Sequence, residues 1–397
     1  MGQQGTTSAA SLPRVALLFA QFSPYHVDRC EAVAKRVAGR FHILAVEVAT
    51  RSQINAWEAS AGISGARKLT LFPGAVFEEI AWPRRLWAQA KALWRCRTVL
   101  VGVPYNEPDI IVLSWLLRLL GVRVVVLSES KFDDVQRSVR FELAKSLVLG
   151  AYGAAIVGGQ RQADYFRFLG FRRRPVLPGY DTVGIERVRA LAEATDTPFA
   201  ARPFVYVGRF VAKKNLTGLI EGYARYAATA GTGARRLVLA GSGEQESAIR
   251  SRAAALGVDG LVDFPGYCDA RTVAGLLAGA LALVLPSTEE QWGLVVNEAL
   301  ALGLPVIVST PVGARDALVR NLVNGFVVEP GSRDGMAAAM AALAGDEALW
   351  RRMAAASTAR AQFGDTERLA DSVELLLDPD ARDAAERVAH FRAALET

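Results

Sequence analysis

The amino-acid sequence predicts an α/β protein built from two parallel-sheet domains. Short apolar runs rich in β-branched residues alternate with longer segments of helical periodicity, which is typical of parallel sheets covered by helices on both faces. This alternation is interrupted at 179–203, where Gly, Pro, Asp and Thr accumulate around one short charged segment. Because 51% of the 397 residues are hydrophobic, the chain can bury two cores.

The interruption sets the expected domain boundaries. We expect a disordered tail at 1–13, a first domain at 14–180, a linker at 181–203 and a second domain at 204–364. The residues from 365 to 397 are rich in Ala, Glu and Arg and contain no strand pattern, so they predict C-terminal helices that pack back toward the first domain. Strands are expected at 15–20, 42–46, 110–113, 122–127, 155–157, 204–207, 236–240, 262–264, 281–285, 305–309 and 325–328, and two of the helices of the first domain at 28–40 and 137–149.

Cysteine usage and apolar run lengths exclude several classes of protein. The three cysteines lie far apart with no Cys-x-x-Cys pair, so the sequence predicts neither a disulfide framework nor a structural zinc site. The longest apolar stretch, 110–127, is broken by Arg118 and Arg123 and is no membrane span. The net charge of +6 favours anionic partners without selecting one, and we expect no nucleic-acid partner. A cytoplasmic protein, at most peripheral on the inner face of the plasma membrane, is predicted.

A basic loop follows the first strand of the second domain. Residues 208–215 read Gly-Arg-Phe-Val-Ala-Lys-Lys-Asn and lead into a helical pattern at 216–226. Arg209 and Lys214 are therefore expected at the carboxyl edge of a sheet, where ligands bind in open α/β folds. Two fixed cations beside a positive helix end suit a diphosphate, although an isolated Arg-x4-Lys is more often a solvated turn.

A glycine turn follows the next strand of the second domain. Residues 241–244 read Gly-Ser-Gly-Glu, and Gly241 would let the backbone approach a ligand closely. By itself the motif is equally an ordinary turn between a strand and a helix.

The most specific motif is an acid pair at 286–300, Pro-Ser-Thr-Glu-Glu-Gln-Trp-Gly-Leu-Val-Val-Asn-Glu-Ala-Leu. Gly293 is expected to open a helix whose first amides point at a ligand. Glu298, further along that helix, can accept hydrogen bonds from both hydroxyls of a ribose. Glu290 precedes the helix and is expected nearer the reacting group. As an alternative, both glutamates are exposed acids near a helix end.

Five ordered motifs resemble the donor domain of family 4 glycosyltransferases over 204–343. These motifs are Gly-Arg-x4-Lys-Asn, Gly-Ser-Gly-Glu, Gly266-Tyr267, Pro-Ser-x2-Glu-x2-Gly-Leu-x3-Glu-Ala and Gly303-Leu304-Pro305-Val306. The resemblance implies the GT-B fold, in which two Rossmann-like domains face each other across a cleft. It makes the first domain the acceptor domain and the second the nucleotide-sugar domain.

The resemblance also implies roles for individual residues. Arg209 and Lys214 would bind the donor diphosphate, Glu298 the ribose, and Glu290 the transferred sugar. The base would lie near Tyr267. The substrate-binding residues expected from the motifs of the second domain are Glu298, Trp292, Gly293, Leu294, Val295, Gly241 and Tyr267.

The implied reaction is transfer of a hexose-type sugar from a UDP- or GDP-linked donor with retention of anomeric configuration. The departing phosphate would take the acceptor's proton. No metal and no cofactor beyond the donor is expected, because Arg209, Lys214 and a helix end would stabilise the charge. The chain lacks an Asp-x-Asp pair, in agreement with metal independence. The acceptor would be a saccharide or lipid-linked molecule, with a role in bacterial cell-surface polysaccharide or glycoconjugate synthesis.

The first domain departs from the family pattern at two places. Many relatives carry Gly-Gly after the first strand, whereas this chain has Ala20 to Arg29 there. In this loop His26 and Arg29 are candidate contacts of the acceptor or of the donor phosphate. As an alternative, His26 is a solvated residue at a helix start. Relatives often place a His after a middle strand, where this chain has Glu129. Glu129 is a candidate substrate contact in its place.

Residues 82–97 combine three tryptophans with five basic residues in a helical pattern. Aromatic and basic side chains together can seat a helix on an anionic membrane. A core helix with a solvated basic face has the same pattern.

Two other functions fit the same fold. A GT-B epimerase acting on UDP-sugars would share the nucleotide site but need an acid and a base around the sugar. A noncatalytic sugar-nucleotide-binding protein would need no complete set of Arg209, Lys214, Glu290 and Glu298.

Overall fold

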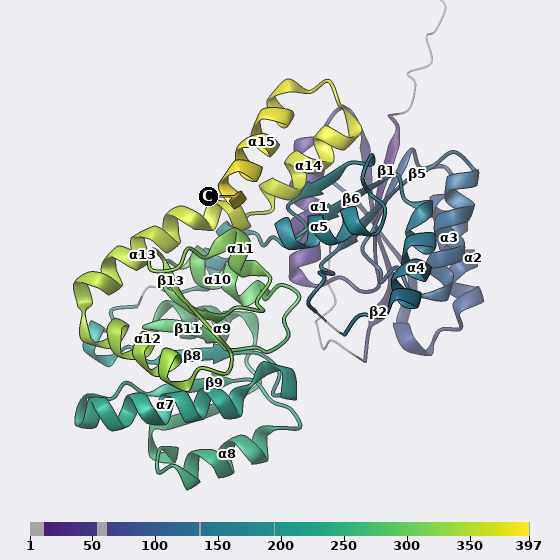
Figure 1. The fold of residues 1–397 in the computed structure, drawn as a ribbon. Helices are drawn as coiled ribbons and strands as arrows, with labels where there is room; N and C mark the ends of the chain where they lie inside the picture. The colour runs from purple at the N-terminus through teal and green to yellow at the C-terminus, as the bar shows by residue number, and fades with distance from the viewer. Residues whose placement is uncertain (1–11, 54–61, 135, 194, 397) are drawn as a thin grey trace, which may run out of the picture.

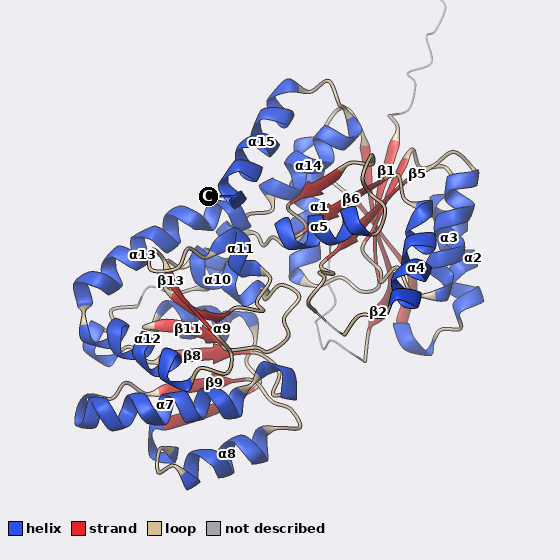
Figure 2. Ribbon diagram, in the orientation of Figure 1, coloured by secondary structure: helices blue, strands red, loops and turns tan. Residues whose placement is uncertain are grey.

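The fold is α/β with two parallel sheets, as predicted. A computed structural model describes residues 12–53, 62–134, 136–193 and 195–396; most of the expected tail, 1–11, lies outside them. Helices cover both faces of each sheet (Figures 1 and 2).

The N-terminal sheet has seven parallel strands in the order β3-β2-β1-β4-β5-β6-β7. Its strands are β1 (Arg14–Phe19), β2 (His42–Arg51), β3 (Arg67–Val76), β4 (Thr98–Val101), β5 (Arg123–Ser128), β6 (Ala154–Val157) and β7 (Val176–Pro178). The helices between them are α1 (Pro24–Arg36), α2 (Trp82–Leu93), α3 (Pro108–Leu119), α4 (Val139–Val148) and α5 (Gln160–Phe168). Buried clusters of apolar side chains lie on both faces of this sheet.

One expected strand, at 110–113, is wrong. These residues lie in α3, which begins with Pro108 at its first turn. Ile110, Leu113 and Leu117 are buried at helical spacing, whereas Leu119 is exposed. The helix is apolar on nearly all sides, so its sequence has the composition of a buried strand.

The C-terminal sheet has six parallel strands in the order β10-β9-β8-β11-β12-β13. Its strands are β8 (Phe204–Val207), β9 (Leu237–Ala240), β10 (Val262–Gly266), β11 (Ala282–Leu285), β12 (Val306–Ser309) and β13 (Gly325–Val328). The helices that follow the first sheet are α6 (Ile185–Leu191), α7 (Leu216–Ala230), α8 (Glu246–Ala255), α9 (Ala270–Ala278), α10 (Leu294–Ala301), α11 (Ala314–Leu318), α12 (Arg333–Gly345) and α13 (Glu347–Ala361). In both sheets the strand order reverses beside the first strand, β1 or β8, which is where α/β proteins bind ligands.

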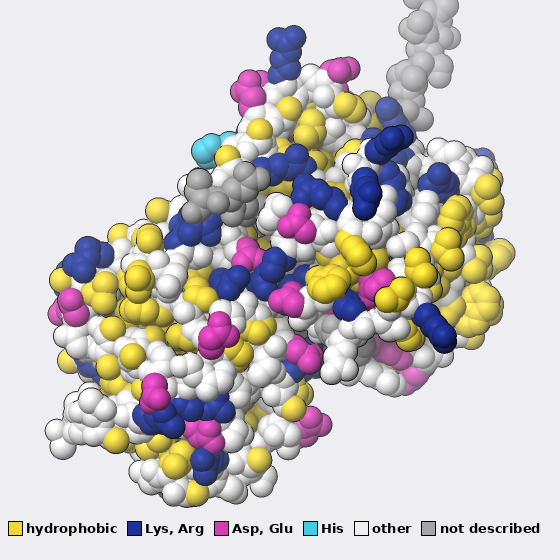
Figure 3. Space-filling model, viewed as in Figure 1, with side chains coloured by type: hydrophobic (Ala, Val, Ile, Leu, Met, Phe, Trp, Pro, Cys, Tyr) yellow, Lys and Arg dark blue, Asp and Glu magenta, His cyan; other side chains and the backbone are white. Residues whose placement is uncertain are grey.

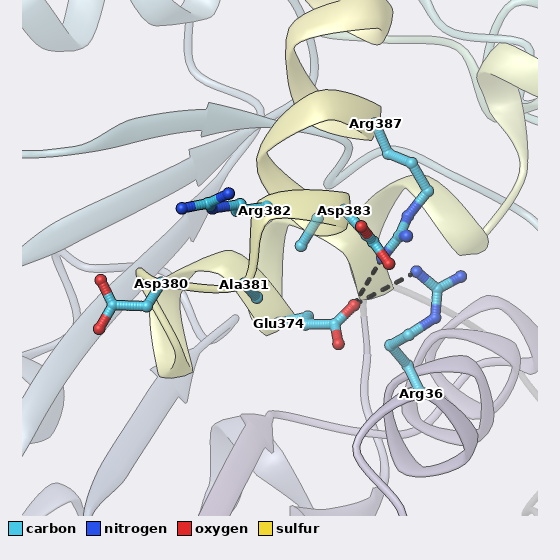
Figure 4. Close-up of a pocket in the computed structure, with 8 residues that line it drawn as sticks. Arg36, Glu374, Asp380, Ala381, Arg382, Asp383 and Arg387 are labelled. Atoms are coloured by element: carbon cyan, nitrogen blue, oxygen red, sulfur yellow. Dashed lines mark hydrogen bonds and ion pairs between the residues drawn. The ribbon is translucent and has the colours of Figure 1, made fainter.

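The last two helices, α14 (Glu367–Leu377) and α15 (Arg382–Glu396), return to the N-terminal domain. Asp371 of α14 is buried and pairs with Arg36 of α1 and with Arg387 of α15. Glu374 bridges the same two arginines (Figure 4). This ion cluster joins α14 and α15 to the first helix of the chain.

Removing the central carboxylate of this cluster should destabilise the protein. We expect Asp371→Ala to lower the free energy of unfolding by about 3–5 kcal/mol, because it leaves arginines without their buried partner. Asp334→Ala is the matched control: its pair with Arg225 is exposed, and its loss should cost about 0–1 kcal/mol. Urea unfolding of both variants measures the difference, and equal losses would contradict a buried, structural cluster.

Candidate functional site

Three strand ends of the C-terminal sheet are drawn together through glycines. The Gly208 amide donates to the carbonyl of Ala240 over 3.0 Å, and the Gly241 amide donates to the carbonyl of Gly266 over 2.8 Å. A Cβ on Gly241 would lie 1.9 Å from the Gly208 carbonyl oxygen, and its φ is +142°. Only glycine fits this approach. The backbone edge therefore stays open beside Arg209, which is exposed.

Lys214 and Glu290 form an ion pair between the loops that follow β8 and β11. The Ser287 hydroxyl also donates to Glu290 Oε2, over 3.1 Å. Asn215 fixes the first loop, because its side-chain amide donates to the carbonyls of Pro286 and Pro330 over 3.1 and 2.9 Å. The two predicted residues are thus brought together on a braced pair of loops.

Arg209 lies near this pair. The charges of both Glu290 and Arg209 act on the buried hydroxyl of Tyr206, whose pKa is raised mainly by burial. The structure therefore gathers Arg209, Lys214 and Glu290 at one edge of the sheet.

Gly293 precedes α10, as the motif predicts. Its φ is +99°, and a Cβ there would lie 2.9 Å from a methyl group of Leu285. Leu294 and Val295 begin the helix and are half-buried, with no acid in its first turn to occupy the free amides. The Trp292 side chain is 2% exposed, and its indole donates to Asn297 over 2.9 Å, so its ring faces the protein interior.

Glu298 contacts the opposite domain. The hydroxyl of Tyr25, in the first turn of α1, donates to Glu298 Oε1 over 2.9 Å. Burial raises the pKa of Glu298, and burial together with Glu298 raises that of Tyr25 well above its ordinary value. Tyr25 was not predicted as a site residue, because only the folded chain shows this contact over 273 positions.

A cavity of about 490 Å³ lies at the carboxyl edge of the N-terminal sheet. It is lined by residues that follow β1, β4, β5 and β7, and His26 and Glu129 both face it. Gln291 of the C-terminal domain closes one side of it. Tyr267, 71% exposed at the end of β10, does not line this cavity.

His26 is held neutral. Burial and the nearby Arg29 lower its pKa to about 3. Its ring stacks on Phe19 with centroids 4.1 Å apart, and its Nδ1 accepts from the Ser23 amide over 3.2 Å. His26 thus completes the capping box of α1 with Ser23, and it also lines the cavity.

Glu129 acts electrostatically on a second carboxyl group that was not predicted, Asp181. Burial and Glu129 raise the pKa of Asp181 well above its ordinary range, and burial also raises that of Glu129. Both carboxyl groups therefore hold a proton more strongly than a solvated carboxyl group does. Arg29, 1% exposed and 4.0 Å from Asp181, supplies the compensating charge. The sequence offered Arg29 as a contact of the acceptor or of the donor phosphate, and the structure places it buried beside Asp181.

The two halves of the site interact across the domain interface. The charges of Glu290 and Lys214 act on Glu129. Gln291 donates to Asp134 over 3.2 Å, and the side chain of Arg161 pairs with Asp316. The cleft therefore presents carboxylates from one domain to a lysine and a glutamate of the other.

No group of three or more His, Cys, Asp or Glu side chains suited to a metal ion occurs among the residues that the structure describes. Among the same residues, no helix is long and apolar enough to cross a membrane.

Residues 196–360 match the family model described as Glycosyl transferases group 1. This segment contains all five motifs on which the resemblance rests, and its similarity to group 1 glycosyl transferases is confirmed. No curated protein matches the chain.

Solved structures share the two-domain arrangement. Sucrose-phosphate synthase from Thermosynechococcus elongatus is 19% identical, with a TM-score of 0.71 over 92% of this chain and 98% of that one. Anabaena HepE, in complex with UDP and glucose, is 16% identical, with a TM-score of 0.68 over 92% and 100%. The lipopolysaccharide outer core galactosyltransferase WaaB is 15% identical, with a TM-score of 0.65 over 91% and 99%. The GT-B fold is thereby confirmed.

His26 should impose a pH dependence on stability. Its pKa of about 3 lies below the ordinary 6.5, so the unfolded chain binds a proton that the folded chain rejects. The free energy of unfolding should therefore fall as the pH drops below 6.5, with a contribution of up to about 1.4 kcal/mol per pH unit. His26→Gln, which keeps a capping side chain, should show a shallower dependence of the free energy of unfolding on pH in denaturant titrations. Equal pH dependences for the wild type and His26→Gln would refute the neutral histidine.

Proposed function

We propose that this chain, whose C-terminal domain belongs to the group 1 glycosyl transferases, moves a hexose-type sugar from a nucleotide donor to a saccharide or lipid-linked acceptor. The observation that supports this most is the gathering of Arg209, Lys214 and Glu290 at one sheet edge, opposite Glu129. That arrangement provides cations for a diphosphate and carboxylates for sugar hydroxyls in one cleft.

In this proposal the donor lies along the edge of the C-terminal sheet. Arg209 and Lys214 bind the diphosphate together with the free amides of Leu294 and Val295. The open edge at Gly241 and the exposed Tyr267 lie beside the base. Ribose hydroxyls bind Glu298, which has two oxygens and so can accept from the sugar and from Tyr25 together.

Lys214 has a second task at the reacting bond. As the bond between sugar and phosphate breaks, negative charge grows on the departing phosphate, and Lys214 stabilises it. Its ion pair with Glu290 holds the ammonium in place before the donor arrives. Glu290 then accepts hydroxyls of the transferred sugar.

The proposed transfer retains the anomeric configuration. The acceptor hydroxyl attacks the face from which the phosphate leaves, its oxygen bonds to the anomeric carbon, and its proton passes to a phosphate oxygen. Because the leaving group takes the proton, no side chain has to serve as general base, and the cations make a metal unnecessary. The HepE complex contains UDP and glucose, which supports a UDP-linked donor over a GDP-linked one.

The cellular setting follows the same reasoning. The free cysteines of the described chain suit a reducing cytoplasm. WaaB is a lipopolysaccharide galactosyltransferase, which supports a place in the synthesis of a bacterial surface polysaccharide or glycoconjugate.

The carboxyl pair of Glu129 and Asp181 favours one second candidate, an epimerase acting on a UDP-sugar. An epimerase needs an acid and a base beside the sugar, and two carboxyl groups whose pKa values are raised can supply both. Product analysis without acceptor separates the two: a new UDP-sugar indicates the epimerase, whereas unchanged donor supports the transferase.

A nucleotide screen tests the donor site. We expect one of UDP, GDP or ADP, or a sugar conjugate of it, to raise the melting temperature of the wild type and to bind by calorimetry. Lys214→Ala should lose this stabilisation because the diphosphate loses a cationic partner. Absence of binding by the wild type would favour a noncatalytic scaffold.

Substitutions in the basic loop test catalysis. Arg209→Ala and Lys214→Ala should each lower turnover by about two orders of magnitude or more, with excess chelator present throughout. Glu298→Ala should mainly weaken donor binding. Lys213→Ala is the control, because Lys213 is exposed and contacts Thr288 through its backbone carbonyl. Wild-type turnover of Arg209→Ala or Lys214→Ala, or activity that requires magnesium, would overturn the assignment.

A further inference from the structure

The N-terminal domain carries an extensive exposed apolar face on α2, α3 and α4. Of 18 large apolar side chains exposed in the described chain, 13 lie between positions 82 and 147. Trp87, Leu119, Phe141 and Leu147 are 67%, 81%, 71% and 75% exposed. The three helices lie side by side at the right of Figure 1, and Figure 3 shows apolar side chains along the same edge. Soluble surfaces rarely gather so many exposed large apolar side chains, which marks an interaction surface.

The exposed charges on the three helices themselves have one sign. Every residue of the three helices is described, and their two acids, Asp109 and Glu142, are buried. Asp109 is bonded to Arg85, and Glu142 to Tyr165. The exposed charges within these three helices are all cationic, namely Arg84, Lys91, Arg118 and Arg140, and Arg95 and Arg97 follow α2. The exposed acids nearest in the chain, Glu78, Glu79 and Asp133, lie outside the helices.

Tryptophans and cations are paired within the face. The Lys91 ammonium lies 5.1 Å from the centroid of the Trp87 ring, and the Arg95 guanidinium lies 4.5 Å from that of Trp94. Such pairs suit the head-group region of a bilayer, where aromatic rings and basic side chains meet lipid phosphates.

Charge also decides against a second copy of this chain as the occupant. A two-fold dimer through this face would place its cations against the same cations of the partner. An anionic lipid surface offers the opposite charge.

A second cavity leads from this face to the cleft. Its volume is about 390 Å³, and it lies between α3 and α4, where Ile111, Phe141, Ala144 and Val148 line it. It shares four lining residues with the cavity that holds His26 and Glu129, namely Tyr105, Asn106, Ser130 and Gln291. The polar groups at its edge, Asp134, Arg137 and Lys145, are bonded within the protein, so the space suits an apolar chain.

We propose that the α2–α3–α4 face seats the protein on an anionic phospholipid bilayer, and that the acceptor is lipid-linked, with its hydrocarbon chain entering between α3 and α4. This inference rests on the proposed function, since it makes the cleft the destination of the acceptor head. It extends the sequence-based expectation for 82–97 to two further helices and selects the lipid-linked class of acceptor.

Vesicle flotation tests the docking face. The wild type should float with vesicles of phosphatidylethanolamine and phosphatidylglycerol and much less with pure phosphatidylcholine. Leu119→Glu combined with Leu147→Glu should lower the bound fraction at least about tenfold, because two inserted side chains become charged. Leu322→Glu, at a site 66% exposed in the C-terminal domain, should bind as the wild type does. The proposal would be overturned if the wild-type protein did not float with the anionic vesicles, or if it formed a dimer in solution that buries the α2–α3–α4 face.

Photolabelling tests the cavity. A phospholipid with a diazirine in its acyl chain, carried in the same vesicles, should label peptides that contain Ile111 and Val148. Ala144→Trp fills the cavity from an exposed position, so it should abolish that label while flotation persists. Labelling confined to the outer positions of α2–α4, or unchanged in Ala144→Trp, would exclude entry between α3 and α4.

The two proposals fail separately. Flotation and labelling need no donor, and nucleotide binding needs no lipid. Lipid binding without nucleotide binding would remove the transferase proposal, whereas the reverse would leave a transferase whose acceptor is not delivered from a membrane.

Discussion

The ion pair between Lys214 and Glu290 joins loops that leave two neighbouring strands of the C-terminal sheet, β8 and β11. The pair forms because the two loops turn toward each other. Asn215, at a φ of +55°, turns the first loop, and its side chain donates to the Pro286 carbonyl in the second. Without Glu290, the half-buried Lys214 would repel the nearby Arg209, and without Lys214, Glu290 would repel Glu129. Because Lys214 and Glu290 neutralise each other, the edge of the C-terminal sheet that carries Arg209 can lie close to the edge of the N-terminal sheet that carries Glu129. The rest of the cleft depends on that balance.

The opposite wall holds two carboxyl groups beside one guanidinium. Burial raises the pKa of both Glu129 and Asp181, and Arg29, 4.0 Å from Asp181, opposes that rise in both. Arg29 also donates to the Thr182 carbonyl over 3.0 Å, which ties α1 to the start of the linker. The same arginine lowers the pKa of His26. One buried cation thus lowers the pKa of three groups around the N-terminal cavity, together with burial for His26 and against burial for Glu129 and Asp181.

The C-terminal half of the site was predictable because its signals are local. Gly241, Gly293 and the spacing of Glu290 and Glu298 each express a backbone or helix requirement within a few residues. The strand predictions were incomplete in the first domain, where β3, β4 and β7 were not expected and 110–113 was wrongly expected. Local signals conflict at two of these places: β3 contains Pro73 and Gly74, which an edge strand tolerates, and 110–113 has a strand's composition within a helix.

Contacts between the domains could not be predicted. The hydroxyl of Tyr25 reaches Glu298, and the Trp292 ring lies so near Gly158 that a Cβ there would be 2.6 Å from it. Both contacts form because the carboxyl ends of the strands of one sheet face those of the other sheet. No periodicity within either half carries information on that docking, so the motif residues were foreseeable and their partners were not.

The path of the chain links the apolar face to the chemistry. Strand β5 ends at Ser128, the next two residues line the cleft, and the same connection continues to α4. Ser130 stands at the junction, since it lines both cavities and its hydroxyl lies 3.3 Å from that of Tyr105. A hydrocarbon chain between α3 and α4 would therefore end where polar side chains begin. The change from apolar to polar lining at this point is what an amphiphilic acceptor requires, because its head must reach Glu129 while its chain stays out of water.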